Sequence, residues 1–187
     1  MCSYNDKIII SIGNIVDDCF LCCSDVIVNP TNPKMRYGMG VSEAIFRKAG
    51  IDSLEKYCEI KFGVGYSKDK QINDMKPAEV RVTPGFSIPC DILFAQGTSV
   101  SYFNINEEEI IPLFDRTYKN VFKECIKRNY KKILLPSLGT GHYGIDHVVA
   151  SKVLIDNAKQ FLDVVQEATI TLVLFEPKYA DMYRKLI

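Results

Sequence analysis

The sequence has no excess of charge of either sign. Its 23 lysine and arginine residues balance 23 aspartate and glutamate residues, so the formal net charge is zero. This balance excludes binding to a broad polyanion as the main activity, although it allows a local anion pocket. No run of about 18 apolar residues is present, so we expect no membrane-spanning segment. The first residues lack the basic region and cleavage site of a signal peptide.

Features that separate domains are missing as well. The chain has no linker rich in Pro, Gly or Ser and no internal repeat, so we expect residues 1–187 to form a single domain. Hydrophobic residues make up 47% and charged residues 25%, which excludes a disordered chain. Seven cysteines are an odd number for an unexported chain, and this indicates free thiols in a reducing, cytoplasmic environment.

Short β-branched runs alternate with segments of helical periodicity. The expected strands are Lys7–Ile12, Asp25–Val28, Glu79–Thr83, Asp91–Ala95, Lys132–Leu135 and Thr169–Phe175. The expected helices are Val41–Ala49, Asp52–Phe62, a helix that begins near Pro112, Asp146–Glu167 and Tyr179–Leu186. Asn29–Pro33 is expected as a turn, and Asp52 with Glu55 as a capping box. The alternation predicts an α/β fold whose ligand binds beyond the carboxyl ends of the strands.

The segment Tyr37-Gly38-Met39-Gly40-Val41 forms a first glycine loop between a strand and a helix. Glycines there allow positive φ and let backbone N–H groups approach a ligand closely. The helix start behind them adds unpaired donors and favours phosphate. An ordinary tight turn explains this loop equally well when it is taken alone. It is not the dinucleotide fingerprint, because Glu43 occupies the third glycine position.

The segment from Ser137 to Gly144 (SLGTGHYG) forms a second glycine loop, again after a strand and before a helix. It is not a Walker loop, since no lysine follows the last glycine. Its three glycines are difficult to explain as a simple connection. Two such loops at the ends of neighbouring strands could hold a diphosphate from both sides through neutral backbone groups.

Together these segments resemble a macro domain. The resemblance rests on VIVNPTN (26–32), YGMGVSEAIFRKAG (37–50), LLPSLGTGHYG (134–144) and LVLFEPKYADMYRKL (172–186), and it extends over essentially the whole chain. It implies a three-layer α/β/α sandwich with a mixed central sheet that binds ADP-ribose in a surface cleft.

The resemblance also implies a role for each matching position. The two glycine loops would wrap the diphosphate, Asn32 would contact the distal ribose and Phe175 would lie against adenine. Asn29 matches an asparagine that is more often structural. The implied ligand-binding residues are Asn14, Ile15, Asn32, Gly38, Met39, Gly40, Val41, Ser137, Leu138, Gly139, Thr140, Gly141, His142, Tyr143 and Phe175.

Two departures from the family pattern bear on function. Asn14 replaces the aspartate that usually reads adenine, which exchanges a charged acceptor for a neutral one. Ser42 and Phe46 stand where many hydrolytic members have an aspartate and a histidine, so the carboxylate that would activate water is missing. We therefore expect a binding module. The alternative is a slow hydrolase of ADP-ribosylated protein or O-acyl-ADP-ribose, with Asn32, Ser42 and His142 as candidate catalytic residues.

The remaining reactive side chains have simpler explanations. Cys19, Cys22 and Cys23 include a CxxC spacing, but no second CxxC follows, and we favour core or chance thiols over a redox pair or a zinc site. His147 is expected to be a solvated helix residue. We expect no metal and no cofactor. The expected partner is ADP-ribose, free or on a protein. We expect no membrane partner, no nucleic acid unless ADP-ribosylated, and a monomeric chain.

Overall fold

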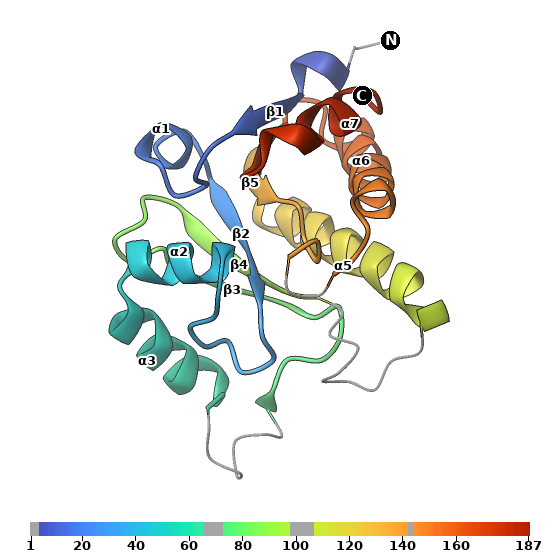
Figure 1. The fold of residues 1–187 in the computed structure, drawn as a ribbon. Coiled ribbons are helices and arrows are strands. Elements are labelled where there is room, and N and C mark those ends of the chain that lie inside the picture. Colours follow the sequence, from blue (N-terminus) through green and yellow to red (C-terminus); the bar gives the residue numbers. More distant parts are fainter. Residues whose placement is uncertain (1–3, 66–72, 98–106, 142–143) are drawn as a thin grey trace.

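The protein is built around one six-stranded sheet (Figure 1). The computed structural model describes residues 4–65, 73–97, 107–141 and 144–187. The strands are β1 (Ile8–Ile12), β2 (Val26–Thr31), β3 (Val80–Thr83), β4 (Asp91–Gln96), β5 (Lys132–Pro136) and β6 (Thr169–Leu174). They lie in the order β1-β6-β5-β2-β4-β3. All neighbouring strands are parallel except β3 and β4, so the sheet is mixed, as expected.

Helices cover both faces of this sheet. They are α1 (Asp18–Leu21), α2 (Val41–Ala49), α3 (Ile51–Phe62), α5 (Glu107–Arg128), α6 (His147–Val164) and α7 (Ala180–Arg184), with short 3₁₀ turns η1 (Tyr4–Asp6) and η3 (Pro177–Tyr179). In Figure 1, α1, α2 and α3 lie on one side of the sheet and α5, α6 and α7 on the other. The expected three-layer α/β/α sandwich is therefore confirmed. None of the described helices has the length and apolar character needed to cross a membrane.

The central strands are apolar on both faces, which is typical of a parallel sheet between two helical layers. On β2, Val26 and Val28 belong to the hydrophobic cluster under α5 and α6, whereas Ile27 belongs to the cluster under α2 and α3. Leu134 of β5 faces the same side as Ile27, between two neighbours that face the opposite side. This alternation fixes the strand register and hence the edge of the sheet at which the loops emerge.

Several segment boundaries differ from the sequence-based expectation, and two of these differences have a physical reason in the structure. β2 continues through Asn29–Thr31, where a turn was expected, because these residues pair with the end of β4. α5 begins at Glu107 rather than near Pro112, since acidic residues in a first turn complement the helix dipole. The four-residue helix α1 was not expected at all, because so short a segment shows no periodicity.

The expected capping box at α3 is wrong. Gly50 is the N-cap residue, and among the described residues no side-chain hydrogen bond caps this helix end. Glu55 instead accepts a hydrogen bond from the backbone N–H of Tyr37 (2.8 Å) and pairs with Arg36 (3.1 Å). The carboxylate of Glu55 therefore supports the first glycine loop rather than its own helix.

Candidate functional site

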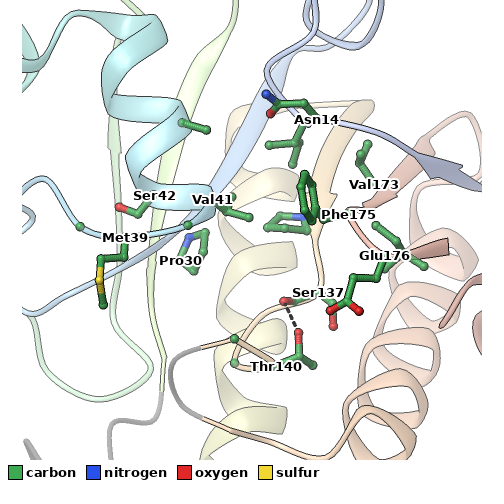
Figure 2. Close-up of a pocket in the computed structure, with 18 of the residues that line it drawn as sticks. Asn14, Pro30, Met39, Val41, Ser42, Ser137, Thr140, Val173, Phe175 and Glu176 are labelled. Atoms are coloured by element: carbon green, nitrogen blue, oxygen red, sulfur yellow. Dashed lines mark hydrogen bonds between the residues drawn. The ribbon is translucent and has the colours of Figure 1, made fainter. Parts of the chain in front are cut away.

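A cleft of about 840 Å³ opens at the carboxyl ends of β1, β6, β5 and β2 (Figure 2). These four strands are neighbours and run parallel, so the loops that follow them meet at one edge of the sheet. The lining residues are Gly13, Asn14, Ile15, Pro30, Thr31, Asn32, Gly38, Met39, Gly40, Val41, Ser42, Ala44, Pro136, Ser137, Gly139, Thr140, Gly141, His147, Val173, Leu174, Phe175, Glu176 and Tyr179. Both glycine loops thus face the same cleft.

The first glycine loop enters α2 through Gly40, which has a φ of 65°. An L side chain is strained in this left-handed region. A Cβ added at Gly40 would meet no atom within 4 Å, so the glycine leaves open space in the cleft. The N–H groups of the first turn of α2 have no helical acceptor and therefore remain available to an anion.

Asn32 folds the chain ahead of this loop. Its Oδ1 accepts hydrogen bonds from the N–H groups of Lys34 (3.1 Å) and Arg36 (3.2 Å), and its Nδ2 donates to the carbonyl of Arg36 (2.7 Å). Asn32 lines the cleft, but three bonds of its amide belong to its own loop. One hydrogen of Nδ2 remains for a ligand.

The second glycine loop is built around Gly139, whose φ is 73°. A Cβ at this position would lie 2.5 Å from Cδ1 of Ile145, so no other residue fits without movement. The carbonyl of Gly139 accepts from the N–H of Ile145 (3.0 Å), and the Thr140 hydroxyl donates to the carbonyl of Ser137 (3.2 Å; Figure 2). None of these bonds uses the N–H groups of Gly139, Thr140 and Gly141.

Two buried tyrosines fix the base of this loop. Tyr118 of α5 accepts a hydrogen bond from the N–H of Leu138 (3.0 Å), and the hydroxyls of Tyr183 and Ser137 are 2.5 Å apart. Burial raises the pKa of both tyrosines, so their hydroxyls stay protonated. Leu138, predicted to bind ligand, lies in the hydrophobic core instead of lining the cleft, and its N–H is already used.

The wall formed by the ends of β1 and β6 contains Asn14, Ile15 and Phe175. Asn14 is exposed, and its Oδ1 accepts from the N–H of Val16 (3.3 Å). Ile15 is buried, whereas Phe175 is 82% exposed and free to lie against a flat ligand. His142 and Tyr143, also predicted to bind ligand, lie outside the described residues.

Comparison with known proteins places this architecture in one family. The family model named Macro domain matches residues 28–154, which is more than half of the chain. The chain belongs to the Macro domain family. The expected family resemblance is thereby confirmed.

Individual macro domains agree with this result. The chain is 26% identical over 165 residues to an O-acetyl-ADP-ribose deacetylase of Enterobacter cloacae, covering 87% of this chain and 86% of the relative. It superimposes with a TM-score of 0.83 on the Oceanobacillus iheyensis macrodomain with ADP, at 25% identity over 99% of this chain and 92% of the other. A Trypanosoma brucei macrodomain in complex with ADP-ribose has a TM-score of 0.76 at 21% identity, over 98% and 72% of the two chains, which shows the fold alone.

The lining residues that were not predicted from the sequence include three polar or aromatic residues on one side of the macro-domain cleft. His147, Glu176 and Tyr179 line its β6 side, and the rings of His147 and Tyr179 stack with centroids 3.4 Å apart. His147 was expected to be solvated, but burial lowers its pKa and its Nδ1 is buried without a hydrogen-bond partner among the described residues. Their positions in the chain could have indicated these residues, since Glu176 follows β6 and His147 begins α6 at the edge of the sheet where ligands bind.

Ser42 lies on the opposite side of the cleft from Glu176 (Figure 2). It is 5% exposed, and its hydroxyl has no hydrogen-bond partner among the described residues. A Cβ at Gly38 would lie 3.3 Å from this hydroxyl. Of the described residues that β2, the first glycine loop and α2 contribute to the cleft, none has a titratable side chain.

Proposed function

We propose that this macro domain binds ADP-ribose, free or as mono-ADP-ribose on a protein. The observation that supports this most is the convergence of two glycine loops on one cleft. Backbone donors hold a diphosphate without basic side chains, which suits a chain whose net charge is zero. The Oceanobacillus iheyensis macrodomain with ADP supports the same ligand class.

The ligand would lie across the sheet edge. We infer that adenine lies against Phe175 near Asn14 and Ile15, and that the diphosphate lies between the loops. The distal ribose would then be near Asn32 and Ser42. The N–H groups of Val41 and of Gly139–Gly141 are the proposed diphosphate donors, whereas Leu138 is not proposed, because Tyr118 already accepts its N–H.

Hydrolysis is the second candidate function. It is favoured by the similarity to the O-acetyl-ADP-ribose deacetylase of Enterobacter cloacae. Against it, none of the described residues on the Ser42 side of the cleft is a base, and general-base help is typically worth 10²–10⁴-fold in rate. We therefore propose that any turnover of ADP-ribosylated protein or O-acyl-ADP-ribose is slow, and that Asn32, Ser42 and His142 remain the candidate catalytic residues.

Calorimetry with ADP-ribose, run beside a turnover assay, tests both candidates. A binding module should bind ADP-ribose more tightly than adenosine and release little product from mono-ADP-ribosylated protein or O-acetyl-ADP-ribose. Failure to bind ADP-ribose at millimolar concentration would contradict the proposal, and fast product release would favour the hydrolase.

The domain organisation, the oligomeric state and the site of action of the chain also stay proposals. We infer one domain over residues 1–187, a monomer, and a cytoplasmic site of action on ADP-ribose or ADP-ribosylated proteins. Light scattering of the purified chain tests the monomer, and limited proteolysis tests the single domain.

A further inference from the structure

The cysteines of this chain fall into two sharply different groups. Cys58, Cys90 and Cys125 are buried, and burial raises the pKa of each of these thiols to about 12. The other three described cysteines are exposed, and all of them lie in or directly after α1. Free cysteine is among the most buried residue types, so three exposed thiols within five positions are unusual. Among the six cysteines that the structure describes, only this second group is accessible to a dissolved reactant.

Cys22 lies between the other two thiols of the group. It is the C-cap residue of α1 and keeps helical backbone angles. Its Sγ is 3.5 Å from Sγ of Cys23, and it donates a hydrogen bond to the carbonyl of Cys19 at 3.8 Å. The side chain of Cys22 therefore already points back over the turn that begins at Cys19.

The distance between Cα atoms decides which neighbouring cysteine can form a disulfide with Cys22. Residues three apart in an α-helix have Cα atoms about 5 Å apart, within the usual 4.4–6.8 Å range of a disulfide. Cα atoms of adjacent residues across a trans peptide are about 3.8 Å apart, below that range. Cys19 is thus the better-spaced partner, although Cys23 has its sulfur next to Cys22.

We propose that Cys19 and Cys22 form a reversible disulfide by exchange with a small-molecule disulfide. The thiolate of Cys19 attacks one sulfur of the small disulfide, forms a mixed disulfide and releases one small thiolate. The thiolate of Cys22 then attacks Sγ of Cys19 and releases the second. The protein loses two thiol protons and two electrons, and the small disulfide is reduced to two thiols.

The order of these steps follows from the neighbours of Cys22. The hydrogen bond with Cys23 raises the pKa of the Cys22 thiol, so a smaller fraction of Cys22 is thiolate than in an ordinary exposed cysteine. Cys22 therefore suits the second attack, which occurs within the protein. An exposed disulfide of this kind is readily reduced again, which makes the change reversible.

The thiol site is separate from the ADP-ribose cleft. None of its three cysteines lines the cleft, although Phe20 of α1 packs over Gly13, with 3.4 Å between its ring and the position of a Cβ. The disulfide therefore does not depend on the proposed function, and saturation with ADP-ribose should leave its formation unchanged.

The test is to equilibrate the reduced chain with excess oxidised glutathione, block free thiols under denaturing conditions and count the labels by mass spectrometry. The reduced chain takes up one label at each of its seven cysteines. Wild type and Cys23→Ser should each lose two labels and regain them with dithiothreitol. Cys22→Ser should lose one label, because Cys19 then keeps its glutathione, and Cys19→Ser should form no disulfide within the protein. Fragmentation of wild type should place the bond between Cys19 and Cys22.

Three results would overturn the proposal. These are an unchanged label count in wild type, a lasting mixed disulfide with glutathione in wild type, and a disulfide within the protein in Cys19→Ser. Melting temperatures of the three variants, all at exposed positions, show whether each is folded.

Discussion

The hydroxyl of Tyr118 accepts a hydrogen bond from the backbone N–H of Leu138 at 3.0 Å, inside the protein core. Tyr118 belongs to α5, and Leu138 lies at the start of the second glycine loop. A buried side chain of one helix thus holds the backbone just before Gly139 and Thr140. This hydrogen bond therefore fixes the base of the loop that we propose for the diphosphate, before any ligand binds.

The first prediction is that Tyr118→Phe weakens diphosphate binding. The change leaves the N–H of Leu138 buried without an acceptor, which typically costs about 1–3 kcal/mol of stability. A less fixed loop must be ordered on binding, so we expect the affinity for ADP to fall by about tenfold, or about 1.4 kcal/mol. The affinity for adenosine, which lacks the diphosphate, should not change. Calorimetry with both ligands measures the difference.

Tyr57→Phe is the matched control for this substitution. Tyr57 lies on α3 and makes edge contacts with the rings of Phe62 and Phe86, and it does not line the cleft. We expect this variant to bind ADP as wild type does. Equal losses for ADP and adenosine in Tyr118→Phe would show a general loss of structure rather than a loss of loop positioning.

The second prediction is that Gly40→Val blocks ADP-ribose while the chain stays folded. Its side chain would enter the open space of the cleft, where the ligand must approach the backbone. The positive φ adds a cost of roughly 1–2 kcal/mol. Gly50→Val is the control, because Gly50 also has a positive φ and open space but lies outside the cleft. A folded Gly40→Val protein with wild-type affinity would contradict the proposed site.

Most of the fold could be predicted because the buried strands are short apolar runs that can be recognised from their composition. Val26–Val28 is apolar on both faces, and its position between two helical layers explains why. The end of β2 was missed because Asn29 and Pro30 are typical turn residues, and only their pairing with β4 keeps them extended. Such a tertiary effect has no local signal. The role of Glu55 was missed for the same reason, since its partner Tyr37 is 18 residues away.

The candidate site was predictable in its glycine loops and less so in its opposite wall. Glycine spacing indicates where backbone must approach a ligand, so Gly40 and Gly139 were found from sequence. His147 and Tyr179 have no such pattern, and their stacking joins segments far apart along the chain. Leu138, which was predicted to bind ligand, is buried and does not line the cleft, because loop membership does not reveal which way a side chain points.

The third prediction concerns the recognition of adenine. Asn14→Asp replaces a neutral acceptor with a charged one, which makes a hydrogen bond about twice as strong. The preference for ADP-ribose over its inosine analogue should hold or rise, by up to about fivefold, or about 1 kcal/mol. Asn14→Ala, which removes the acceptor, should lower this preference. Competition binding with both ligands measures it, and a clear loss in Asn14→Asp would mean that Asn14 does not read the base.

The fourth prediction is a pH dependence of stability caused by His147. Burial lowers the pKa of His147 in the folded state below the usual 6.5, and Lys178 lowers it further by a smaller amount. Glu176 and Asp146 act in the opposite direction and raise it, but burial has the larger effect. Below about pH 6.5 the unfolded chain therefore binds more protons at this residue than the folded chain, and stability falls as the pH falls. His147→Gln should lose less stability than wild type between pH 7 and pH 5.5. Urea unfolding at both pH values gives the comparison, and parallel losses would exclude His147 as the cause.

The fifth prediction concerns turnover. Hydrolysis at the distal ribose needs a group that accepts a proton from water, and the part of the chain that the structure describes places no base beside Ser42 in the cleft. Ser42→Asp would place a carboxyl at a position only 5% exposed, where burial raises the pKa of a carboxyl toward the range useful for a general base. We expect the release of ADP-ribose from a mono-ADP-ribosylated protein to rise at least about tenfold above wild type.

Ser42→Asn is the control that separates charge from shape. Asparagine has nearly the size of aspartate and must fit beside Gly38 in the same way, but it cannot take a proton at neutral pH. Faster release in Ser42→Asp than in Ser42→Asn therefore assigns the gain to a base at this position. If wild type already releases ADP-ribose quickly and neither variant changes the rate, the proton acceptor lies elsewhere, and His142→Ala then tests the remaining histidine candidate of the second glycine loop.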